Sequence, residues 1–233
     1  MGDVFLLPPR AIEIARNSLM KQIFSSPAYT VSEHVPAEAR KDVVLVTLAN
    51  RMPEDGPRRP FAHHILAPLG YRTLNLVPAS NDWYQSEGIE EALAFIRERS
   101  RDEHTIGFAA SMGAFGLVNY ADLLGLDAAL AFSPQYALER SLVPFETRCE
   151  DDAIRMGPFP RHRIPLRPQP EKLVIYYDNE YDLDARQVDL IARHLDFTRV
   201  PCPGTVHNVL GTWYRQRQMQ DKVREAIGAV SPA

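Results

Sequence analysis

The sequence predicts an α/β protein with a mostly parallel central sheet and helices on both faces, folded as a single domain of residues 1–233. Two observations predict this fold class. Short apolar runs rich in β-branched residues recur along the chain, and several are apolar on both faces, as expected of strands buried on both sides. Segments with helical spacing of apolar residues lie between most of these runs. This alternation implies parallel strands joined by right-handed crossovers.

Six runs have the composition of strands, and four segments between them have the pattern of helices. The expected strands are 42–50, 73–78, 105–110, 128–134, 172–178 and 197–203. The expected helices are 60–70, 88–101, 114–127 and 184–196, with a last helix after residue 207. The N-terminal part is less regular, and its pattern is compatible with a helix over 10–24 and an edge strand over 28–35.

One connection breaks the alternation. Residues 135–171 hold no strong strand and are rich in proline and arginine. A long irregular insertion in a compact domain is usually functional or mobile, and this one falls where a lid would cover the site described below. A surface loop without a role is the alternative. If such a lid closes, its arginines would favour an anionic substrate; they are Arg155, Arg161, Arg163 and Arg167.

Composition narrows the possible partners and compartment. The net charge of −4 and the pI of about 6.0 give no sign of a nucleic-acid or membrane-surface partner. Cys149 and Cys202 are expected to be reduced thiols. The N-terminus lacks a basic leader, and no stretch approaches the roughly 18 to 20 apolar residues of a membrane helix. The sequence therefore predicts a cytoplasmic location, and it leaves the oligomeric state open.

No cofactor or metal is expected. No G-x-G-x-x-G or P-loop follows any of the strands, which argues against dinucleotide or ATP binding. His63 and His64 are adjacent on an expected helix, but the chain has no H-E-x-x-H or H-x-x-E-H spacing.

Ser111 is the strongest candidate for a catalytic residue. An apolar strand runs into Ser111-Met112-Gly113 and then into a helix, which is the context of a nucleophile elbow. The usual pattern of such an elbow is G-x-S-x-G, because small residues two before and two after the serine let helix and strand approach. Here Ala109 replaces the first glycine, at the cost of one methyl group.

A serine hydroxyl needs a base, and the base needs a carboxylate that fixes its tautomer. His207, in the loop after the last expected strand, is the candidate base. The acid is expected after the preceding strand, where Asp182 is preferred. Asp178 is a close second that looks like the last residue of the strand, whereas Asp184 looks like a helix cap. The order Ser, Asp, His is the one found in enzymes with a nucleophile elbow.

Four further residues are candidates for the site. Two N–H groups must hold the oxyanion, and we expect them from the backbone of Met112 and of Asn50, which follows the first central strand. Trp83 and Tyr84 follow the next strand, whose carboxyl end borders the site in an open α/β sheet. They are expected to line a substrate pocket or, alternatively, to belong to the core.

At these residues the sequence resembles the α/β-hydrolase superfamily. The resemblance spans about residues 42–215 and rests on the S-M-G turn at 111–113, the segment A-F-S-P-Q at 131–135, and the acidic and His207 loops. More narrowly, the chain looks like uncharacterised bacterial hydrolase-like proteins that share the S-M-G turn, the S-P-Q segment and a W-Y pair like that at 83–84. The resemblance implies a serine-hydrolase fold and no particular substrate.

The expected function is that of a serine hydrolase of the esterase, thioesterase or acyl-transfer type. It would act through an acyl-enzyme on a small-molecule acyl substrate, with Ser111, His207 and Asp182 as its triad. The alternative is a non-catalytic binding or accessory module that keeps the fold. Ala109, the absence of a His-Gly oxyanion signature and the choice among three aspartates favour that alternative.

Overall fold

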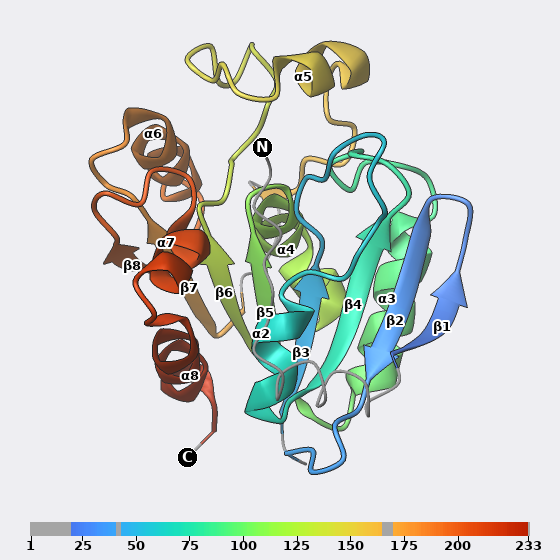
Figure 1. The fold of residues 1–233 in the computed structure, drawn as a ribbon. Helices are drawn as coiled ribbons and strands as arrows, with labels where there is room; N and C mark the ends of the chain where they lie inside the picture. Colours follow the sequence, from blue (N-terminus) through green and yellow to red (C-terminus); the bar gives the residue numbers. More distant parts are fainter. Residues whose placement is uncertain (1–19, 41–42, 165–169, 233) are drawn as a thin grey trace.

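The computed structural model describes residues 20–40, 43–164 and 170–232, and it contains one sheet whose strands follow the order β1-β2-β4-β3-β5-β6-β7-β8 (Figure 1). The strands are β1 (Lys21–Ser25), β2 (Tyr29–His34), β3 (Val43–Leu48), β4 (Arg72–Pro78), β5 (His104–Ala110), β6 (Ala128–Phe132), β7 (Lys172–Tyr177) and β8 (Thr198–Pro201). The helices are α2 (His63–Leu66), the short η1 (Ala67–Leu69), α3 (Ile89–Ser100), α4 (Met112–Leu124), α5 (Glu150–Met156), α6 (Asp182–Ile191), α7 (Val209–Arg215) and α8 (Met219–Val230).

The sheet is mostly parallel, as predicted. Strands β3 to β8 pair in parallel, and β1 and β2 add an antiparallel hairpin that joins the sheet through β2 and β4. The N-terminal expectation needs two corrections. Residues 21–24 lie in β1 and not in a helix, and β2 is covered by β1 and is therefore not the edge strand. The rest of the expected helix over 10–24, apart from Met20, lies outside the described residues.

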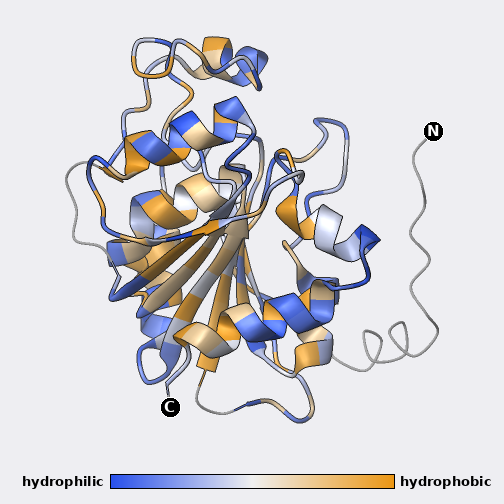
Figure 2. Cartoon of the chain, turned by 90° about the vertical axis from the view of Figure 1, so that its left-hand side faces the viewer, coloured by the Kyte–Doolittle hydropathy of each residue, from blue (hydrophilic) through white to orange (hydrophobic). Residues whose placement is uncertain are grey.

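Helices cover both faces of the sheet, and each face has its own core. Alternate residues of β3 divide between the two cores, with Val44 and Val46 on one side and Leu45 on the other. The first core contains α3, α4 and α6, and the second contains α2, α7 and α8. Figure 2 shows the apolar strands between these helical layers, whose outer surfaces are largely hydrophilic. The predicted arrangement of helices on both faces is thus confirmed.

The part of the connection between β6 and β7 that carries α5 lies beyond the carboxyl ends of the parallel strands (Figure 1). None of the helices in the described residues has an apolar stretch of the length that a lipid bilayer requires.

Two histidines outside the expected site, His34 and His63, pack against each other. His34 is fully buried, and its ring meets that of His63 edge-on at 4.7 Å between centroids. Neither ring nitrogen of His34, nor Nδ1 of His63, has a hydrogen-bond partner among the described residues. Burial, and then the neighbouring His34 and His64, lower the pKa of His63 from 6.5 to about 4. The folded protein therefore holds His63 neutral where the unfolded chain protonates it.

We expect acid to destabilise the protein through this pair. Between pH 6.5 and about 4, His63 is protonated in the unfolded state and neutral in the folded state. The free energy of unfolding therefore falls as the pH falls through this window. The partial exposure of the ring reduces the effect, and we expect a loss of about 1 kcal/mol between about pH 7 and about pH 5. Urea unfolding at both pH values would show a smaller loss for His63→Phe than for the wild type. Equal losses of stability in the two proteins would contradict the attribution of the pH effect to His63.

Candidate functional site

Ser111 occupies a strained turn between β5 and α4. Its backbone angles are φ 53° and ψ −125°, a conformation that a residue with a side chain rarely adopts. The turn is fixed at both ends, because the N–H of Ser111 donates to the carbonyl of Phe132 and its carbonyl accepts from the N–H of Phe115, each at 2.9 Å. Such strain persists only where the surrounding structure imposes it, and it places the serine at the carboxyl edge of the sheet.

Gly113 allows the turn to pack against the end of β3. A Cβ atom added at Gly113 would lie 2.3 Å from the carbonyl oxygen of Leu48 and 3.1 Å from that of Ala49. Ala109, two residues before the serine, is buried and pairs with Leu48 in the sheet. The small residues on both sides of Ser111 therefore serve the close approach of helix and strand.

Gly113→Ala is expected to destabilise the fold by about 1–3 kcal/mol, because its methyl group meets backbone atoms that have little freedom to retreat. The matched control is Gly228→Ala in α8, where an added Cβ would have no neighbour within 4 Å. That control should be neutral or stabilising by up to about 1 kcal/mol, given the helix propensity of alanine. Urea unfolding of both variants measures the difference, and similar free energies would refute the packing argument.

His207 reaches Ser111 from a loop that Asp178 holds. The loop joins β8 to α7, and Val206 in it has a positive φ of 54°. The buried carboxylate of Asp178 accepts from the N–H groups of Val206 at 2.7 Å and Glu180 at 2.9 Å. Asp178, the second candidate for the acid, therefore ties together the two loops that follow β7 and β8.

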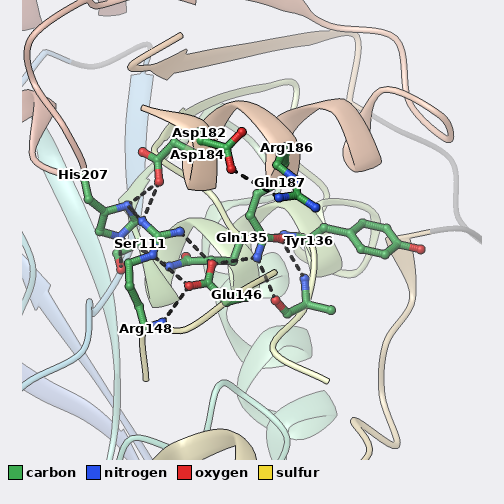
Figure 3. A network of polar contacts seen from close by, with 11 residues as sticks. Ser111, Gln135, Tyr136, Glu146, Arg148, Asp182, Asp184, Arg186, Gln187 and His207 are labelled. Carbon is green, nitrogen blue, oxygen red and sulfur yellow. Dashed lines mark hydrogen bonds and ion pairs between the residues drawn. The ribbon is translucent and has the colours of Figure 1, made fainter. Parts of the chain in front are cut away.

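Three side chains converge at this edge (Figure 3). Nε2 of His207 lies 2.9 Å from Oγ of Ser111, and Nδ1 of His207 lies 2.8 Å from Oδ1 of Asp184. The side chain of Asp184 is only 1% exposed and that of His207 is 25% exposed. A buried carboxylate, an imidazole and a hydroxyl in hydrogen-bond sequence have the geometry needed to activate a serine.

The carboxylate beside His207 is that of Asp184, whereas the sequence favoured Asp182. Asp182 pairs with Arg186 at 3.2 Å, and its side chain is 73% exposed. Both aspartates lie in the first turn of α6. Each residue of a helix advances about 100° around the axis, so side chains two positions apart point to nearly opposite sides. The cap role expected of Asp184 is also absent, because the N-cap is Tyr181 and no side chain caps this helix.

Electrostatics keep Asp184 ionised. Burial alone would raise the pKa of this carboxyl group, but the hydrogen bond and charge of His207 and the guanidinium of Arg148 outweigh it and lower the pKa. Arg148 comes from the segment between β6 and β7, and no sequence pattern singled it out. Gln135 of the S-P-Q segment is also at the site, with Nε2 3.3 Å from Nε2 of His207.

The expected oxyanion donors lie close together in the fold. Met112 is the first residue of α4, immediately after Ser111, and Asn50 lies two residues after the end of β3. The carbonyls of Leu48 and Ala49 face Gly113, so the loop that carries Asn50 passes beside the serine turn. The backbone N–H of Met112 and of Asn50 remain the proposed donors.

Trp83 and Tyr84 are part of the core and do not line an open pocket. Both side chains are fully buried. Trp83 donates from Nε1 to Asp152 at 3.2 Å, and the hydroxyl of Tyr84 donates to the carbonyl of Ala49 at 2.6 Å. The substrate-binding role expected from sequence does not fit this burial. Instead, Tyr84 supports the loop that carries Asn50.

Ion pairs attach the expected lid to the rest of the molecule: Arg161 pairs with Glu90 at 2.9 Å and Arg163 with Asp122 at 2.7 Å. Arg155 pairs with Asp152 at 2.9 Å inside the segment itself. These guanidinium groups are therefore already neutralised, which weakens the expectation that they select an anionic substrate. Arg167 lies outside the described residues. Closure of this segment over the site remains a prediction.

The described residues contain no cluster of three or more His, Cys, Asp or Glu side chains with the arrangement of a metal site.

Comparisons with known proteins establish the fold. No protein-family model and no curated protein matches the sequence, so the narrower resemblance to bacterial hydrolase-like proteins has no support from sequence comparison. Among solved structures, the chain is similar to the capsule O-acetyltransferase of Neisseria meningitidis serogroup A, with a TM-score of 0.64, 12% identity and coverage of 89% of this chain and 92% of the other.

Two further similar structures are a fluorophosphonate-binding serine hydrolase of Staphylococcus aureus and a thermophilic esterase of Thermogutta terrifontis with bound butyrate. The first gives a TM-score of 0.59 at 11% identity and covers 93% of this chain and 99% of the other. The second gives a TM-score of 0.59 at 13% identity, with coverage of 93% and 96%. These likenesses show that the chain has the α/β-hydrolase fold.

Proposed function

We propose that the protein is a serine hydrolase that cleaves an ester, thioester or related acyl bond through an acyl-enzyme. The observation that carries the proposal is the chain of contacts from Ser111 to His207 to Asp184, at 2.9 Å and 2.8 Å, on a strained turn between strand and helix. A serine in such a turn, within reach of an oriented imidazole, suits acyl transfer better than mere binding.

In the first step, Oγ of Ser111 attacks the carbonyl carbon of the substrate while Nε2 of His207 takes the serine proton. The N–H groups of Met112 and Asn50 stabilise the negative oxygen of the tetrahedral intermediate. The bond to the leaving group then breaks, and His207 gives its proton to that group. Asp184 keeps Nδ1 of His207 protonated and stabilises the imidazolium that forms.

In the second step, a water molecule attacks the acyl-enzyme and loses a proton to Nε2 of His207. The bond between the acyl carbon and Oγ of Ser111 breaks, and the proton returns to the serine. This step releases the carboxylic acid and restores the enzyme without any cofactor.

Acyl transfer to a hydroxyl acceptor is the second candidate. One of the similar structures is the meningococcal O-acetyltransferase in complex with CoA, at 13% identity and a TM-score of 0.58, covering 89% of this chain and all of the other. The same residues would serve, with an alcohol in place of water in the second step.

A panel of short- and medium-chain nitrophenyl esters and acyl-CoA thioesters, with and without carbohydrate hydroxyl acceptors, tests the proposal. We expect release of the leaving group above the buffer rate with at least one substrate class. Acceleration by an acceptor, with the acylated acceptor as product, would favour transfer over hydrolysis. Absence of turnover across the panel would favour a non-catalytic module.

A further inference from the structure

Arg148 brings a positive charge from the segment between β6 and β7 into direct contact with the candidate triad (Figure 3). Its Nη1 lies 2.6 Å from Oδ1 of Asp184 and 2.8 Å from Nδ1 of His207. Oδ1 of Asp184 therefore accepts from both the imidazole and the guanidinium. When Nδ1 of His207 carries a proton, Nη1 and Nδ1 are both donors, and their contact is not itself a hydrogen bond. The other oxygen of Asp184, Oδ2, is buried and has no hydrogen-bond partner among the described residues. The hydrogen bonds to Oδ1 thus fix the orientation of the Asp184 carboxylate.

Glu146 holds Arg148 in this position. Nε and Nη2 of Arg148 donate to the two oxygens of Glu146 at 2.9 Å and 2.7 Å, the paired geometry that fixes a guanidinium most firmly. Glu146 also accepts from Nε2 of Gln187 at 2.8 Å, and Gln187 lies one turn after Asp184 in α6. The guanidinium further lies 5.4 Å from the ring centroid of Tyr181, at the start of the same helix.

The charges of this group balance when His207 is protonated. The side chains of Glu146 and Asp184 are each 1% exposed, and that of Arg148 is 18% exposed. Two buried carboxylates with only one guanidinium between them leave one negative charge, which the imidazolium of His207 cancels during the reaction. Removing Arg148 would leave two buried carboxylates without their shared cation, which is costly and favours protonation of one of them.

We propose that Arg148 is a positioning residue, which fixes the orientation of Asp184 and keeps its carboxylate charged, so that the segment between β6 and β7 completes the triad. This inference rests on the proposed function. The orientation of Asp184 then depends on Arg148, a residue of the segment between β6 and β7. That segment therefore has a defined part in the reaction. Arg148 acts on the reaction through Asp184, whose Oδ1 lies 2.6 Å from Nη1 of Arg148.

The test is Arg148→Met, assayed with a substrate that the wild type turns over. We expect kcat to fall by about 10- to 100-fold with KM within about threefold, because a misplaced acid weakens the imidazolium without changing substrate contacts. The loss should be larger on the acid side of the pH profile, where Asp184 lacking Arg148 takes up a proton more readily. Arg148→Lys keeps the charge and should recover part of kcat.

Two further variants separate positioning from a merely structural role. Arg140→Met removes an exposed ion pair with Glu150 on the same segment, and it should leave kcat unchanged. The double variant Glu146→Gln with Arg148→Met removes both charges, so no lone buried carboxylate is left where Glu146 stood. We expect it to unfold at nearly the wild-type temperature and still to show the loss of kcat.

The proposal is overturned if the double variant regains wild-type kcat. It is also overturned if Arg148→Met keeps the wild-type kcat and pH profile, or if Arg148→Met is more active than the wild type. In each of these cases wild-type turnover still stands, so the proposed function survives. A wild type without turnover on any acyl substrate would instead remove the proposed function itself.

Discussion

Ser111→Ala is expected to lower kcat by about 10⁴-fold or more, the scale on which loss of a serine nucleophile acts in enzymes of this type. The substitution removes the oxygen that lies 2.9 Å from His207 and leaves the rest of the turn intact. The melting temperature should change little, because alanine fits the space of the serine side chain. Residual turnover would come from the oxyanion donors and substrate binding alone.

Ser133→Ala is the matched control for this variant. Ser133 follows β6, the strand next to β5, also has a positive φ, and is buried with a hydroxyl that has no partner among the described residues. We expect its kcat to stay within about threefold of the wild type, because its hydroxyl makes no hydrogen bond to any described residue, Ser111 and His207 included. If both variants lose activity equally, disturbance of the sheet edge and not loss of the nucleophile explains the result.

Asp184→Asn is expected to lower kcat by about 10²- to 10⁴-fold, while Asp182→Asn stays near the wild type. An asparagine presents an amide to Nδ1 of His207, which favours the tautomer that carries its proton on Nε2 and is unable to accept one from Ser111. Asp182 contacts Arg186 on the exposed side of α6. Its carboxylate therefore does not orient His207. The two substitutions are chemically identical and two residues apart.

Steady-state kinetics of the two variants at neutral pH show which aspartate orients His207. A large loss in Asp182→Asn together with an active Asp184→Asn would restore the acid that the sequence favoured and would contradict the geometry. Comparable losses in both would indicate a general requirement for negative charge at the start of α6.

The parts of the site that depend on local pattern were predictable from the sequence. Ser111 stands between an apolar strand and a helix, and a turn of this kind needs small neighbours, which Gly113 and Ala109 supply. The six runs expected to be strands correspond to β3 to β8. Apolar residues throughout mark β3 to β6, which are buried on both sides, whereas β8 is a largely exposed edge strand.

The acid was not predictable, because its identity depends on where α6 begins. A shift of two residues along a helix turns a side chain by about 200° around the axis, from the protein interior to solvent. Three aspartates at positions 178, 182 and 184 make sequence spacing a weak guide. Each has a distinct position in the fold: Asp178 holds the His207 loop, Asp182 faces Arg186 and Asp184 faces His207.

Long-range contacts account for the other differences. Arg148 looks like any charged residue of a proline- and arginine-rich segment, and only the folding of that segment onto α6 reveals its partners. Trp83 follows a strand end that borders the site, yet its ring packs against Phe115 and Phe159 in the core. Composition does not tell which side of a loop an aromatic residue faces.

Covalent labelling by a fluorophosphonate probe tests most directly whether Ser111 is an activated nucleophile. Intact-mass measurement and peptide mapping should find one probe on Ser111 of the native protein. Labelling should be lost in Ser111→Ala and strongly slowed in His207→Ala, because the hydroxyl depends on the imidazole for its reactivity. Native protein that takes up no probe, or takes it up at another residue, would contradict the account.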